Sequence, residues 1–173
     1  MTDRFAHQLR LDQIGEGQRL DLVAGDAERG LIAKRLGLAS LGRFEAHVCL
    51  SRTGAIVRAE GRLLAALSQS CVVTGDAVAA HIDEPFALLF VPEPSPGAIE
   101  DEVELGEADC DTAFYDGAMI DLGTALADTL ALALDPYPRS AGADAALKEA
   151  GVMSEEQASP FAVLAKLRKT DET

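Results

Sequence analysis

The chain has 173 residues, of which 48% are hydrophobic, and is long enough for one domain with a substantial core. No apolar run approaches the roughly 20 residues of a membrane span, and the first residues lack the order of a signal peptide, which predicts a cytoplasmic protein. The net charge is −14, and fifteen acidic residues lie between Arg62 and Arg139, where no Lys or Arg occurs. Such a stretch disfavours broad contact with the phosphate backbone of a nucleic acid. Its charge predicts either binding to a basic partner or a role only in keeping the protein in solution.

The N-terminal residues alternate polar and apolar side chains over 7–14 and again over 18–24, with a Gly-containing link between them. This pattern predicts a β-hairpin. Asp26 is then expected to cap a helix over 27–38, and Lys34 and Arg35 suit the C-terminal end of that helix. Its inner face is predicted to carry Leu31, Ile32 and Leu36.

Alternation returns in two longer stretches, which predict strands that each bury one face. In 44–52 the buried face is predicted to consist of Phe44, Ala46, Val48 and Leu50, which places Cys49 on the other side. In 56–73 it is predicted to consist of Val57, Ala59, Leu63, Leu67, Gln69 and Cys71. The turn signal at 74–76 and a further strand over 78–90 favour antiparallel pairing.

The second half of the chain begins with prolines and a dense acidic run, which predict a mobile acidic loop over 92–118. Asp121 is expected to cap an apolar helix that ends before Pro136. Residues 135–143 should then run extended, and a last short helix is predicted over 159–169. The fold class is therefore α+β: a largely antiparallel sheet with one helix in the N-terminal half, a central helix and a short C-terminal helix. We expect a single domain over 1–173, with 139–173 as a C-terminal appendage.

The sequence contains little that could support catalysis. Cys49, Cys71 and Cys110 stand far apart, as do the three histidines, which predicts no metal site, and no cofactor motif occurs. Nucleophilic chemistry at Cys71 would need a nearby base and an electropositive setting, whereas its sequence neighbours are apolar and acidic. We therefore expect a buried structural thiol and a protein that is not an enzyme.

Four stretches in a fixed order carry a resemblance to a known family: "DAERGLIAKRLGL", "QSCVVTGDAV", "DLGTALADTLALALDPYPRSAGA" and "SPFAVLAKLRK". Together they resemble the alphaproteobacterial branch of the YceD family, the large ribosomal RNA subunit accumulation proteins. The resemblance implies a cytosolic, non-enzymatic factor for accumulation and processing of 23S rRNA. Many members carry a C-x-x-C pair where this chain has Cys71 and Thr74, so Cys71 looks like the remnant of a pair. The family-motif residues are Gln69, Ser70, Cys71, Val72, Val73 and Thr74.

Two binding hypotheses follow from the resemblance and the charge pattern. The first is an adaptor for a basic ribosomal protein or assembly factor, and the alternative is a processing factor that contacts 23S rRNA precursor through a basic strand face near Arg52, Arg58 and Arg62. No membrane or DNA partner is expected. In the adaptor hypothesis the acidic run and a rigid, proline-flanked Tyr–Arg segment contact the partner, although the prolines could also serve only to stop the helix. The candidate residues are Asp135, Pro136, Tyr137, Pro138, Arg139, Glu100, Asp101, Glu102 and Glu104.

Overall fold

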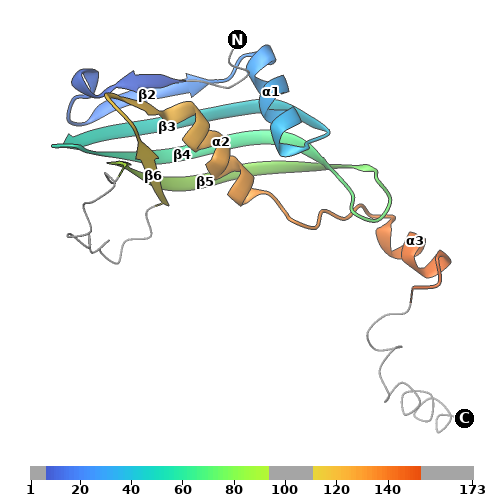
Figure 1. Cartoon of the computed structure of the whole chain (residues 1–173). Coiled ribbons are helices and arrows are strands. Elements are labelled where there is room, and N and C mark those ends of the chain that lie inside the picture. Colours follow the sequence, from blue (N-terminus) through green and yellow to red (C-terminus); the bar gives the residue numbers. More distant parts are fainter. Residues whose placement is uncertain (1–6, 94–110, 153–173) are drawn as a thin grey trace, which may run out of the picture. The chain divides into compact units, whose positions relative to one another are not determined.

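The computed structural model describes residues 7–93 and 111–152 (Figure 1). The described chain divides into two compact units. The first unit contains residues 7–69, 79–93 and 111–136, and the second contains residues 70–78 and 137–152. Nearly all of the larger sheet, the helix between its first two strands and the central helix lie in the first unit. The second unit combines the connection between two strands with the segment that follows the central helix.

A five-stranded sheet forms the framework of the first unit, in the order β2-β3-β4-β5-β6. Its strands are β2 (Gln18–Val23), β3 (Ser40–Thr53), β4 (Ile56–Ser70), β5 (Ala77–Pro92) and β6 (Asp111–Tyr115). β3 pairs antiparallel with both β2 and β4, whereas β6 runs parallel to β5. The predicted α+β class with a mostly antiparallel sheet is therefore confirmed.

The buried face of β3 and β4 is the one that the alternation predicted. Every side chain assigned to it from the sequence is buried, and Cys49 is exposed on the opposite side. Gly61 of β4 lies opposite Val48 in the register. A Cβ atom at Gly61 would lie 1.8 Å from the carbonyl oxygen of His47, so the pairing of the two strands at this point depends on glycine.

The first strand does not form the predicted hairpin. β1 (Gln8–Arg10) pairs antiparallel with β7 (Met119–Asp121) in a separate two-stranded sheet, whereas β2 pairs with β3. A short 3-10 helix, η1 (Leu11–Gln13), follows β1. The hairpin prediction was wrong because alternation identifies a strand but not its partner. Burial of Ile120 next to β1 explains the observed choice.

Helix α1 (Asp26–Leu36) begins one residue earlier than predicted and ends two residues earlier. Gly25 is the N-cap, and its N–H donates to the Glu28 carboxylate at 2.8 Å, while Asp26 forms an ion pair with Arg29. The prediction of Asp26 as the cap was therefore wrong, since Glu28 satisfies the first backbone donor instead. Ile32 is buried, as predicted, and the helix ends at Gly37 with a φ of 65°.

Helix α2 (Leu122–Ala133) lies across one face of the sheet (Figure 1). The Asp121 carboxylate accepts the Thr124 N–H at 2.9 Å, which confirms the predicted cap. Leu122, Leu126 and Leu130 are fully buried in the core that α2 shares with the sheet. The apolar helix predicted after Asp121 therefore packs against the sheet through these leucines.

Three described elements, β6, β7 and α3, lie where no helix or strand was expected. β6 lies within 92–118, the stretch predicted to be a loop, because Tyr115 at its end is buried and its hydroxyl donates to the carbonyl oxygen of Ala55. Helix α3 (Ala143–Glu149) follows the predicted extended segment in the second unit, where Ala143 is buried. The predicted helix over 159–169 lies outside the described residues.

Candidate functional site

The turn that contains the family motif belongs to the second unit. The Cys71 N–H donates to the carbonyl oxygen of Asp76 at 2.7 Å, and the Gly75 N–H donates to that of Cys71 at 2.9 Å. Gly75 has a φ of 77°, a conformation that costs glycine little and other residues more. These bonds close the chain around Cys71.

The sulfur of Cys71 is the centre of this turn. The residue as a whole is only 4% exposed. It accepts N–H groups from Val73 and Thr74, both at 3.4 Å, and from Ser140 at 3.2 Å. Two donors therefore come from the turn itself, and the third comes from the segment after α2. The predicted inward position of Cys71 is confirmed.

The surroundings of the Cys71 sulfur differ from those expected from the sequence. Hydrogen bonds to Ser140 and Thr74 lower the pKa of Cys71 to about 6, although burial opposes this shift. The side chains of Ser140 and Thr74, and after them the backbone N–H groups of these residues, stabilise a thiolate without any charged side chain. The expectation of a merely apolar and acidic environment was wrong, since it considered only side chains near Cys71 in sequence.

This arrangement makes a testable prediction about pH. The thiol has an unfolded pKa of about 8.5, so the folded pKa is depressed. The stabilisation by the thiolate is then complete above the unfolded pKa and is lost as pH falls through the folded pKa, about 6. We expect Cys71→Ala to lose more stability relative to wild type at pH 9 than at pH 6, measured by urea unfolding. The exposed Cys49→Ala is the control, and an equal loss for Cys71→Ala at both pH values would contradict this account.

The segment Tyr137–Ser140 is held directly against the Cys71 turn. The Val72 N–H donates to the carbonyl oxygen of Pro138 at 2.9 Å, and the hydroxyls of Thr74 and Ser140 are 3.1 Å apart. Thr74 also donates to the Asp76 carboxylate at 2.6 Å. Thr74, where the resemblance implied a second cysteine, therefore holds the Ser140 end of the segment against the turn.

The structure thus brings together two sets of residues that the sequence suggested separately. Cys71–Thr74 and Tyr137–Arg139 form one small unit, in which Tyr137 is 73% exposed and Pro138 is buried. Arg139 forms an ion pair with Asp144 at 2.8 Å. Contact of this segment with a partner stays a prediction.

The remaining candidates lie elsewhere. Within the first unit, the Gln69 side chain donates to the carbonyl oxygen of Asp135 at 2.8 Å, which fixes the chain just before Pro136. Glu100, Asp101, Glu102 and Glu104 lie outside the described residues. Among the residues that the structure describes, no three His, Cys, Asp or Glu side chains come together as a metal site would require.

The basic strand face of the RNA hypothesis is occupied by internal interactions. Arg58 pairs with Glu60, and Arg62 pairs with Asp83 on β5. The guanidinium of Arg52 donates to the carbonyl oxygens of Gly54 and Leu11. Each of these pairings competes with a phosphate for the same guanidinium group.

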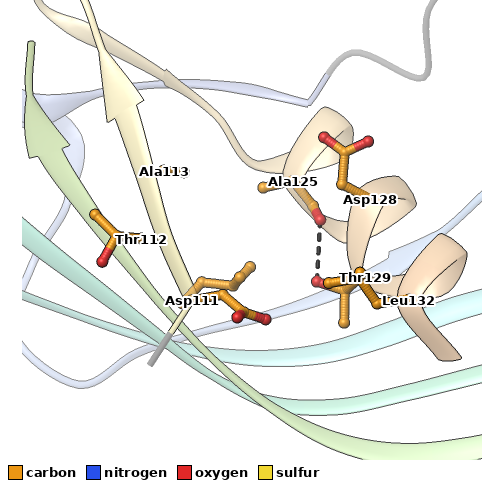
Figure 2. A pocket seen from close by; sticks show the side chains of 8 residues that line it. Asp111, Thr112, Ala113, Ala125, Asp128, Thr129 and Leu132 are labelled. Atoms are coloured by element: carbon orange, nitrogen blue, oxygen red, sulfur yellow. Dashed lines mark hydrogen bonds between the residues drawn. The ribbon is translucent and has the colours of Figure 1, made fainter. Parts of the chain in front are cut away.

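A groove between β6 and α2 was not found from the sequence, since β6 was expected to be loop (Figure 2). It has a volume of about 370 Å³ and lies entirely in the first unit. The adjacent aromatic residues Phe114 and Tyr115, which favour strands, are the sequence signal that could have revealed its β6 wall. Its lining residues are Leu88, Asp111, Thr112, Ala113, Ala125, Asp128, Thr129 and Leu132.

The fold and these sites define an α+β protein built on a mostly antiparallel sheet, with a turn centred on the thiol of Cys71. The sequence model of one family, described as "Large ribosomal RNA subunit accumulation protein YceD", matches residues 59–168. This match covers more than half of the chain, which therefore belongs to the YceD family. It includes both the Cys71 turn and the segment held against it.

No curated protein and no solved structure matches the chain significantly. In the described part, no helix has the length and apolar character needed to cross a membrane.

Proposed function

We propose that this protein supports accumulation of the large-subunit ribosomal RNA and assembly of the large subunit in the cytoplasm. It acts by binding a basic ribosomal protein or assembly factor, and not by catalysis. The observation that carries the role is membership of the YceD family, whose description names this accumulation. The match over 59–168 includes the Cys71 turn, α2 and the segment after it.

The charge distribution supports a protein partner over direct RNA contact. Strands β5, β6 and β7 and helix α2 contain no Lys or Arg, although together they carry several carboxylates. Phosphate contact depends on Lys and Arg that release counterions from the nucleic acid. The arginines of β4, in turn, already pair with carboxylates of the same sheet. A cationic protein segment is the partner that this half of the sheet favours.

Removal of the protein from growing cells tests the role. We expect less mature 23S rRNA and a smaller large-subunit peak in sucrose gradients, with 16S rRNA less affected, since the proposed partner belongs to the large subunit. The measurement is the 23S to 16S ratio together with the gradient profile, during fast growth and in the cold. A plasmid copy of the wild-type gene is the control and should restore both.

An unchanged large-subunit peak under both conditions would overturn the proposed role. The mechanism is tested separately, by measuring the affinity of the purified protein for 23S rRNA fragments over a range of salt concentrations. Direct RNA contact through several arginines would give tight binding that falls steeply with salt, and this result would favour the RNA-binding alternative.

A further inference from the structure

The groove between β6 and α2 combines an apolar lining with open access (Figure 2). Leu88 and Ala113 come from the two parallel strands, and Ala125 and Leu132 come from the helix. Leu132 is 76% exposed although its neighbours on the inner face of α2 are fully buried. A leucine in this position leaves apolar surface that a partner side chain could cover.

One wall of the groove is a sheet edge. β6 is the last strand in the sheet order, and in the described part of the chain no strand pairs with its outer side. Its backbone N–H and C=O groups on that side are available for an added strand. An extended peptide is therefore the shape that this wall fits.

A polar group on the same wall lacks a partner. The hydroxyl of Thr112 is buried, and it has no hydrogen-bond partner among the described residues. A buried hydroxyl without a partner is unfavourable, so an occupant that supplies a hydrogen bond gains affinity.

Charge decides which extended segment would fit. Asp111 begins β6, and Asp128 of α2 stands on the other wall, where it forms an ion pair with Arg35. Asp111 has no ion-pair partner among the described residues. Since Asp128 is already paired with Arg35, Asp111 supplies the negative charge of the groove that attracts a cationic segment.

We propose that this groove is the docking site for an extended, Lys- and Arg-rich protein segment. The segment adds to the edge of β6 that no described strand occupies, places one apolar side chain against Leu132 and brings a positive charge near Asp111. This inference rests on the proposed function, because it names the surface through which the basic partner binds.

Photo-crosslinking of the full chain tests the surface. A benzophenone amino acid replaces Leu132 in one variant and Val23 in the other, and each is irradiated with the total protein extracted from purified large ribosomal subunits. Val23 is the matched control because it is 66% exposed and lies on β2, the opposite edge of the same sheet. We expect a crosslink to one or a few basic proteins from position 132 only. Crosslinks equally strong from position 23, or only between two copies of this chain, would overturn the proposal.

Substitutions that add a positive charge or remove a negative one measure the contribution of the groove to binding and to function. Leu132→Lys removes the apolar contact and repels a basic segment, so we expect at least about tenfold weaker binding of the crosslinked protein. Asp111→Asn should weaken binding less, and Val23→Lys should not change it. All three exposed positions should keep the wild-type melting temperature.

The same variants separate this inference from the proposed function. In a deletion strain with a lowered level of mature 23S rRNA, the Leu132→Lys protein should fail to restore that level, whereas the Val23→Lys protein should restore it. If Leu132→Lys restores 23S rRNA fully and binds the crosslinked protein as tightly as wild type, the groove is not the docking site. The proposed ribosomal role is unaffected by that result. A deletion strain with normal 23S rRNA would overturn the proposed ribosomal role. The crosslinking experiment would then be the test of the docking site.

Discussion

Replacing Gly61 with alanine is expected to prevent stable folding of the sheet. The new Cβ atom would lie 1.8 Å from the carbonyl oxygen of His47, 2.9 Å from its carbonyl carbon and 3.1 Å from the ring of Phe86. The first two atoms are backbone, so β3 and β4 must separate at their centre. We expect a loss of at least about 3 kcal/mol, since overpacking alone costs roughly 1–3 kcal/mol and the strand pairing is disturbed as well.

Gly42→Ala is the matched control for this substitution. Gly42 also lies in a strand of the sheet, but a Cβ atom there would lie 3.6 Å from the carbonyl oxygen of Ala66, an ordinary contact. Urea unfolding of both variants, followed by circular dichroism, measures the difference. A Gly61→Ala protein as stable as Gly42→Ala would show that the strands do not approach as closely as described.

Leu126→Ala is expected to give the second large loss of stability. Leu126 is fully buried between α2 and the sheet, and truncation of such a side chain removes apolar burial and leaves a cavity. The expected cost is about 2–5 kcal/mol in the free energy of unfolding. Thermal and urea unfolding measure this loss.

Leu132→Ala is the control in the same helix. Its side chain is largely exposed, so the same change of residue type should alter stability by no more than about 0.5 kcal/mol. Equal losses for the two variants would mean that α2 does not pack on the sheet through the Leu126 face.

The sequence predicted those features that depend on neighbours along the chain. The buried faces of β3 and β4 follow from strict alternation, and the start of α2 follows from Asp121 before an apolar run. Both signals are local, because a strand has a period of two residues and a helix cap acts within its first turn. The same locality explains why the cap of α1 was misplaced by one residue, since Asp26 and Glu28 compete within one turn.

The features that were missed depend on residues far apart in the sequence. β1 pairs with β7 and not with β2, and β6 adds to β5 across the acidic run. Short strands of this kind carry too few alternating residues to stand out among polar neighbours. Helix α3 was missed in a similar way, because its alanines give no clear apolar stripe.

For the candidate site, the sequence indicated the residues but not their chemistry. Resemblance pointed to Cys71 and Thr74, and the prolines pointed to Tyr137 and Arg139, yet nothing in either stretch showed that they lie in one unit. The low pKa of Cys71 arises first from the side chains of Ser140 and Thr74 and then from the backbone N–H groups of the same two residues. The larger contributor, Ser140, lies 69 residues away along the chain, so the residues around Cys71 do not reveal it.

The pairing of Gln8 with Asp121 has a consequence for how the chain is made. During synthesis from the N-terminus, β1 leaves the ribosome long before β7 exists. At about 5–20 residues per second, β1 then waits on the order of ten seconds for its partner. In that interval Leu9 has no strand to pair with, and nascent chains should be most open to proteases or chaperones at this end. The closing step of folding is therefore set by the rate of translation and not by the intrinsic speed of strand pairing.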